Sequence, residues 1–168
     1  NHFEGKSLRL KQQYFLVSAS LQNIVYDHYN RYKTVANLAD KVAIHINDTH
    51  PALCIPELMR ILMDDFSYTW DDAWNIVTKT VAYTNHTVMS EALEKWSEDL
   101  IARRLPRIHM ILREINQRFC GQMWDKFPGD WDKIDRMSIF SHSQIKMANL
   151  SVIASHKVNG VSALHSNI

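Results

Sequence analysis

The chain has 168 residues, a formal net charge of +1, 46% hydrophobic residues and 22% charged residues. This composition is typical of a globular domain with a substantial core, and it excludes a disordered chain. The small net charge gives no support for a nucleic-acid partner or an anionic membrane, and no apolar run reaches the about 18 residues of a membrane-spanning helix.

The N-terminal half alternates helical and strand-like patterns. Apolar residues three and four apart predict helices, and short apolar runs beside turn residues predict strands. Pro56 suits the first turn of a helix, where a backbone N–H is not needed. The predicted elements are a helix over about 8–30, a polar connection over 30–40, a strand over 42–46, a helix through Pro56 to about Asp65, a helix from Asp71 and a strand over 80–83.

The C-terminal half is richer in helical patterns. The hydroxyl of Ser90 can cap a helix start, and Pro106 should kink or divide a long helix. The predicted elements are a helix from Ser90, a long helix over about 98–120, a turn and short helix over 127–134, an ambiguous strand-like segment over 148–155 and a helix opening within 156–166. Strands alternating with helices predict a helix-rich α/β fold with a parallel sheet.

Both strands of the N-terminal half end in polar clusters, which read AIHINDTH and VAYTNHT. Ligands of parallel α/β sheets lie beyond the carboxyl ends of the strands, so the two clusters share one crevice if the strands are neighbours. Asp48 can accept hydrogen bonds from hydroxyls, while Asn47, Asn85, His50 and His86 can both donate and accept. Such a set suits a sugar, which presents many hydroxyls and little charge.

Other interpretations of these residues stay open. Asp48 could cap a turn or a helix start, and a histidine at a strand end is often a structural hydrogen-bonding group. We expect no metal site, because His45 and His50 do not have the spacing of a zinc pair. We also expect no nucleotide site, because the four glycines form no phosphate-binding loop.

The cysteines and the ends of the chain carry two further expectations. Cys54 and Cys120 lie within apolar helical patterns, which predicts buried free thiols in a cytoplasmic protein. The chain begins with Asn1 rather than Met and ends at Ile168 without a turn or cap. We therefore expect a piece of a longer protein.

Several long motifs point to one family. They are LRLKQQYFLVSASLQNIV, HINDTHPALCIPELMRILMD, AYTNHTVMSEALEKW, REINQRF, FPGD and SHKVNGVSALHS. In this order and spacing they resemble the α-glucan phosphorylases, namely glycogen, starch and maltodextrin phosphorylase. The resemblance covers essentially the whole chain, and IKMANLSVIASH is similar to the bacterial enzymes.

The resemblance implies a fold and an activity. The family has two Rossmann-like domains facing across a cleft, a two-domain glycosyltransferase (GT-B-like) fold, and residues 1–168 match part of the N-terminal domain, without the C-terminal cofactor domain. Its members transfer a glucosyl unit from the non-reducing end of an α-1,4-glucan to inorganic phosphate, giving α-glucose 1-phosphate in glycogen degradation. They use pyridoxal phosphate, work in the cytoplasm and form homodimers.

The resemblance also implies roles for residues at the two strand ends. His86 matches the catalytic-site histidine of the TNHT motif, whose ring bonds the sugar 6-hydroxyl and whose backbone carbonyl faces the anomeric region. Asp48, His50 and Asn85 match residues that line the substrate pocket. Neutral dipoles there suit an oxocarbenium-like transition state.

Some features depart from the family pattern. Tyr26 and Asp27 stand where animal muscle enzymes have paired arginines for AMP, so we expect no activation by AMP. Arg113 replaces a tyrosine of the animal glycogen-storage site. The Schiff-base lysine and the phosphate-binding Arg and Lys pair match no part of this chain, so we expect the isolated chain to be inactive and to expose apolar surface. The alternatives are a non-catalytic carbohydrate-binding fragment and a metal-dependent hydrolase.

Overall fold

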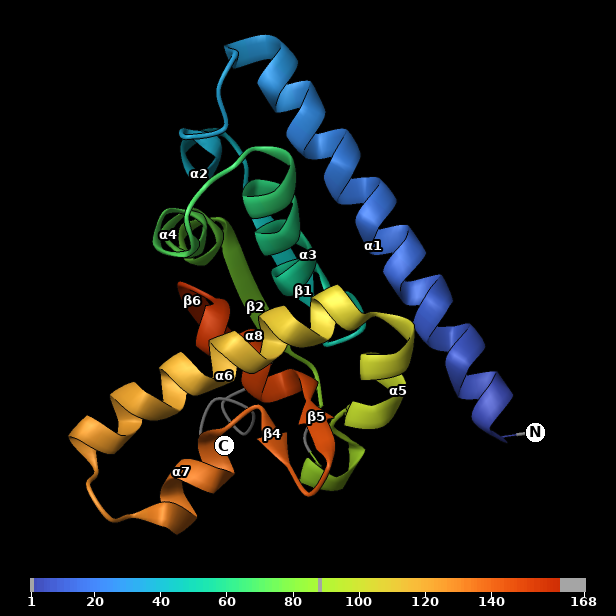
Figure 1. Cartoon of the computed structure of the whole chain (residues 1–168), viewed down its shortest axis with the longest axis vertical. Coiled ribbons are helices and arrows are strands. Elements are labelled where there is room, and N and C mark those ends of the chain that lie inside the picture. Colours follow the sequence, from blue (N-terminus) through green and yellow to red (C-terminus); the bar gives the residue numbers. More distant parts are fainter. Residues whose placement is uncertain (1, 88, 161–168) are drawn as a thin grey trace.

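The computed structural model describes residues 2–87 and 89–160 (Figure 1). A long helix, α1, runs along one side of the molecule, and α3 and α5 pack against it. The elements are α1 (His2–Tyr32), α2 (Leu38–Lys41), β1 (Ile44–Asn47), α3 (Cys54–Arg60), η1 (Ile61–Asp65), α4 (Trp70–Thr80), β2 (Val81–Asn85), η2 (Ser90–Ala92), β3 (Lys95–Ser97), α5 (Glu98–Arg104), α6 (Pro106–Lys126), α7 (Trp131–Met137), β4 (Phe140–Ser141), β5 (Gln144–Lys146), α8 (Met147–Ala154) and β6 (Lys157–Gly160).

The main sheet has three parallel strands in the order β1-β2-β6. Ile44 lies opposite Val81 and Asn47 opposite Thr84, so β1 and β2 run in register to their carboxyl ends. A smaller antiparallel sheet has the order β3-β5-β4. The expected α/β fold with a parallel sheet is confirmed.

The two faces of the parallel sheet differ in chemistry. Side chains alternate between faces along a strand. Ile46, Val81 and Tyr83 on one face are buried in a core that α3 and α6 complete. The opposite face presents the exposed polar residues His45 and Asn47. Because parallel sheets are normally covered on both faces, this polar face is the distinctive feature of the sheet.

The predicted helix boundaries have identifiable capping groups. The hydroxyl of Thr69 accepts the Asp72 N–H at the start of α4, and Asp130 accepts the Lys133 N–H at the start of α7. Pro106 divides the predicted helix over 98–120 into α5 and α6, as a proline at the first helical position permits.

An ion pair within α3 has a buried carboxylate, and a hydrogen bond from Tyr14 joins this carboxylate to α1. The Glu57 carboxylate has no solvent exposure, and Arg60 Nε lies 2.5 Å from its Oε1 atom. Arg60 Nη2 donates to Glu57 Oε2 at 3.1 Å, and the Tyr14 hydroxyl donates to Oε1 at 2.9 Å. Burial and the Glu57 carboxylate raise the pKa of Tyr14. A charge removed from water needs such partners to be tolerated.

The helix that begins at Cys54 ends in a wider π-helical turn, η1. The Phe66 N–H bonds the Ile61 carbonyl at 3.3 Å, five residues back. Two consecutive carboxylates then reach different helices. Asp64 accepts two hydrogen bonds from Arg107 of α6, and Asp65 accepts one from Tyr26 of α1.

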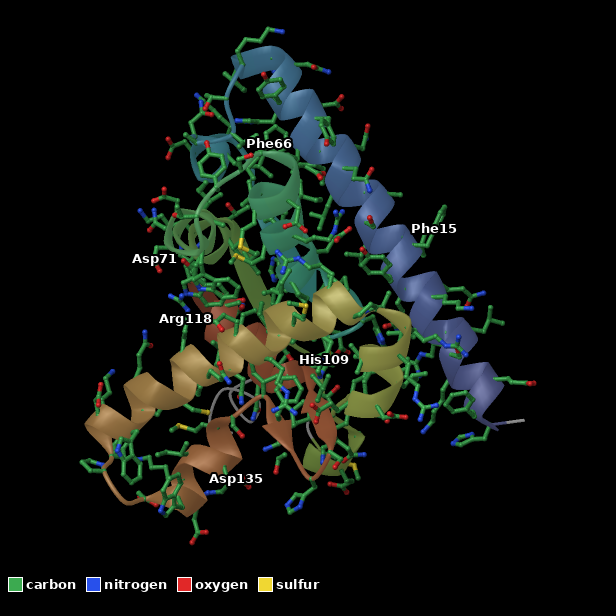
Figure 2. All side chains as sticks on the ribbon, viewed as in Figure 1. Phe15, Phe66, Asp71, His109, Arg118 and Asp135 are labelled. Carbon is green, nitrogen blue, oxygen red and sulfur yellow. The ribbon has the colours of Figure 1, made fainter. Side chains whose placement is uncertain are left out.

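A salt bridge and a cation–π contact hold α6 against α4. Figure 2 shows Arg118 of α6 reaching toward Asp71 of α4, and the two are 3.0 Å apart at Nη1 and Oδ1. The Arg118 guanidinium also lies over the Trp70 ring.

On α1, Phe15 points away from the body and is 71% exposed, which agrees with the expectation of exposed apolar surface.

Several sequence predictions are wrong. The segment over 148–155 is helical, within α8, because residues with helical spacing face the core. Ser90 starts only the single 3-10 turn η2, and the next full helix begins after Ser97, whose hydroxyl accepts the Leu100 N–H. The connection over 30–40 contains the end of α1 and the start of α2. Lys157–Gly160 is a strand, and the rest of the helix predicted within 156–166 lies outside the described residues.

Candidate functional site

The carboxyl ends of β1 and β2 lie side by side (Figure 1). The Asp48 N–H donates to the Thr84 carbonyl at 3.0 Å, which extends the strand pairing one residue beyond β1. The condition under which the two polar clusters would share one crevice, namely that their strands are neighbours, is therefore met. In parallel sheets this edge is where ligands bind.

One side-chain contact joins the two clusters directly. Nε2 of His86, just past the end of β2, contacts Oδ1 of Asn47, the last residue of β1. Both side chains are exposed to solvent. The contact places an imidazole and an amide together on the polar side of the sheet, where each keeps hydrogen-bonding atoms for a ligand.

Asp48 and Asn85 both use one side-chain oxygen to close their own turn. Asp48 adopts a left-handed backbone with φ 66°, which Asp tolerates better than most residues, and its Oδ1 accepts the Thr49 N–H at 2.8 Å. Asn85 Oδ1 accepts the Thr87 N–H at 2.8 Å. The turn-capping interpretation is thus realised, and within residues 2–87 and 89–160 no hydrogen bond occupies Asp48 Oδ2 or Asn85 Nδ2.

The Asp48 carboxylate also influences Tyr83 on the buried face of β2. Burial and the Asp48 charge raise the pKa of Tyr83 to about 12, so its hydroxyl stays protonated at neutral pH. Among the described residues this buried hydroxyl has no hydrogen-bond partner.

His50 belongs to a separate charged group. Its Nδ1 lies 3.8 Å from Oε2 of Glu94, and Arg9 of α1 donates to the same oxygen at 2.8 Å. The Glu94 Oε1 and the Trp96 Nε1 are buried and have no partner among the residues that the structure describes. Among the described residues, no hydrogen bond or ion pair links the His50 side chain to Asp48 or His86. The convergence of Asp48, His50 and His86 on one ligand stays a prediction.

Sequence analysis missed Glu94 and Arg9 as neighbours of the candidate site. No local pattern singles them out, because Arg9 lies on α1 and Glu94 lies before β3. Both stand within or beside the motifs that carry the family resemblance, which is the one signal that could have found them.

A second polar row crosses the sheet next to the candidate site. His45 Nε2 lies 2.6 Å from the Thr84 hydroxyl oxygen, and this hydroxyl donates to Asn159 Oδ1 at 2.9 Å. The three residues come from β1, β2 and β6. The row fixes the side chain of Thr84 beside Asn47, and sequence analysis did not identify it.

The described residues show neither a metal cluster nor a membrane span. Over residues 2–87 and 89–160, no three His, Cys, Asp or Glu side chains gather where they could hold a metal ion. No helix of that part of the chain is long and apolar enough to cross a bilayer.

Comparison with known proteins gives one consistent result. The chain matches the carbohydrate phosphorylase family over residues 1–168. It is 55% identical to the glycogen phosphorylase of Bacillus subtilis (strain 168) over 99% of this chain and 21% of that protein. It is 51% identical to the cytosolic alpha-glucan phosphorylase 2 of Arabidopsis thaliana, over 98% of this chain and 21% of that protein. With the muscle-form glycogen phosphorylase of Homo sapiens, it is 48% identical over 100% of this chain and 21% of that protein. The chain thus spans about a fifth of the length of these relatives.

Proposed function

Because the chain belongs to the carbohydrate phosphorylase family, we propose that it supplies one wall of the glucosyl site of an α-glucan phosphorylase. The whole enzyme would transfer a glucosyl unit from the non-reducing end of an α-1,4-glucan to inorganic phosphate, giving α-glucose 1-phosphate. In this proposal His86 is the catalytic-site residue, and Asp48, His50 and Asn85 bind substrate.

The single observation that carries the proposal is the contact of His86 with Asn47 across two adjacent strand exits. It places an imidazole and an amide together at the edge of a parallel sheet. Positive charge develops on the sugar ring during glucosyl transfer, and dipoles held in place stabilise it without reorganising. The Asp48 carboxylate adds an acceptor for hydroxyls beside them.

The pyridoxal phosphate that the family implies does not fit the residues of this site. The exits of β1 and β2 carry Asn, Asp, Thr and His, without a lysine for a Schiff base or an arginine for a phosphate. We therefore assign the cofactor and the phosphate-binding groups to other parts of the enzyme. We also propose that the whole enzyme has the two-domain glycosyltransferase fold, with these residues in its N-terminal domain, and that it is a cytoplasmic homodimer.

Titration of maltoheptaose against the chain tests the proposed sugar site. We expect His86→Ala to weaken binding by roughly three- to tenfold, which is the range that one net hydrogen bond contributes. His2→Ala, at the exposed start of α1, is the matched control and should leave the affinity unchanged. Equal affinities for the two variants would contradict the proposal.

A second assay tests whether the isolated chain turns over. With pyridoxal phosphate, phosphate and maltoheptaose present, we expect no glucose 1-phosphate above the protein-free background. Product formed by the chain alone would show that it carries its own phosphate and cofactor groups.

A further inference from the structure

We propose that Asn47 is a positioning residue that holds the His86 imidazole in its Nε2–H tautomer. Nδ1 is then left as an acceptor for a hydroxyl of the glucosyl unit. The first part depends only on the contact between the two side chains, and the second part rests on the proposed function.

The chemistry of the two atoms determines which one carries the hydrogen. The amide oxygen of Asn47 can only accept a hydrogen bond, so a neutral His86 ring must donate to it from Nε2. A neutral imidazole has one hydrogen on its two nitrogens, and Nδ1 therefore keeps its lone pair. The opposite orientation of the amide would impose the opposite tautomer. The tautomer therefore reports whether the amide oxygen of Asn47 faces the ring.

The sheet register brings the two side chains to the same face. Asn47 lies opposite Thr84, and His86 follows Thr84 by two residues, which returns it to the face that Asn47 occupies. Thr84 does not compete for Asn47, because its hydroxyl hydrogen goes to Asn159 and its oxygen lies against His45 Nε2. The polar row across the sheet thus leaves Asn47 Oδ1 to His86.

The pairing has a consequence for the kind of ligand group that His86 accepts. A ring with a lone pair at Nδ1 accepts a hydrogen bond, and the ligand hydroxyl donates it. A carboxylate in place of the amide would add a charge that favours the imidazolium ion. An imidazolium ion would place positive charge beside a sugar ring that is itself becoming positive. Asn47 supplies an acceptor without that charge.

Ring-nitrogen NMR of the ¹⁵N-labelled 168-residue chain tests the tautomer. Spectra would be recorded at a pH where the imidazole is neutral, and His86→Ala would identify the His86 signals by their loss. We expect the unmodified chain to show a single Nε2–H form with Nδ1 unprotonated. Nitrogen signals averaged as in free histidine, or an Nδ1–H form, would overturn the proposal.

Three variants extend the test. Asn47→Leu removes the acceptor, so His86 should relax to the tautomer mixture of free histidine, whereas Asn47→Asp keeps an acceptor and should keep the Nε2–H form. Asn23→Leu, on the exposed side of α1, is the matched control and should change nothing. A His86 spectrum that is the same in Asn47→Leu as in the unmodified chain would also overturn the proposal.

Maltoheptaose titration separates this inference from the proposed function. We expect Asn47→Leu to weaken binding by roughly three- to tenfold. A fixed Nε2–H tautomer in a chain that binds no glucan would support the positioning role and contradict the proposed function. Glucan binding by a chain whose His86 tautomers are mixed would support the proposed function and contradict the positioning role.

Discussion

Arg60→Met should destabilise the chain by about 3 kcal/mol, because it leaves the buried Glu57 carboxylate without its cationic partner. Removing one member of a buried ion pair costs about 3–5 kcal/mol. Arg60 keeps 21% of its side chain exposed and the Tyr14 hydroxyl still bonds Glu57, so the lower end of that range applies. Domains of this kind have about 5–15 kcal/mol of total stability, so the loss is a large share.

Urea unfolding followed by circular dichroism measures the effect. In a thermal scan the midpoint should fall by about 6–12 °C. Arg103→Met is the matched control, because Arg103 pairs with Asp99 where both side chains are mostly exposed, and its midpoint should barely move. Replacing both members of the buried pair, with Glu57→Leu added to Arg60→Met, should recover part of the loss. An Arg60→Met variant as stable as the control would refute the reasoning.

Three further predictions concern stability and thiol reactivity. Hydrogen bonds from Arg107 lower the pKa of Asp64, so that pair stabilises the fold above the usual Asp pKa of about 3.9 and loses its effect as the pH falls through the lowered value. The difference in urea midpoint between the unmodified chain and Arg107→Leu should therefore close in acid; a difference independent of pH would contradict this. Gly129→Ala should cost about 1–2 kcal/mol, because φ is 79° there; the cost should not exceed this range, since no neighbour would clash with the new Cβ atom. Gly121→Ala within α6 should instead stabilise the fold by roughly 0.5–1 kcal/mol in the same unfolding assay. Burial raises the pKa of the Cys54 thiol to about 12, so a thiol reagent at neutral pH should modify it only after unfolding, and rapid native-state reaction would show that the site opens.

The strands of the candidate site are predictable from sequence because each apolar run stops abruptly at polar turn residues. The run over 42–46 and the run over 80–83 both lie within one or two residues of the observed strands. The helix through Pro56 and the division at Pro106 are predictable for a similar reason, since proline restricts where a helix can begin.

The strand-like prediction for the segment that forms α8 is wrong because local residue preference and tertiary packing favour different structures. Val152 and Ile153 are β-branched and locally favour a strand. Met147, Leu150 and Ala154 are buried with helical spacing, and packing of that face against the core decides the outcome. Tertiary contacts of this kind are invisible in a short window.

The partners within the site depend on register, which sequence does not supply. That His86 meets Asn47 follows from Asn47 lying opposite Thr84, and a slip of one residue would place the two side chains on different faces. The grouping of His50 with Glu94 and Arg9 likewise depends on how α1 packs. The polar residues at the strand ends could be identified from the sequence, but the pairs that their side chains form could not.

The wide turn at η1 sets the angular phase of everything that follows it. Asp64 and Asp65 are adjacent in the chain, yet they serve Arg107 on one helix and Tyr26 on another. Successive residues of an α-helix are rotated by about 100°. Deleting one residue from Ile61–Asp65 would therefore swing the next carboxylate away from its helix, so this stretch should tolerate substitutions far better than changes in length.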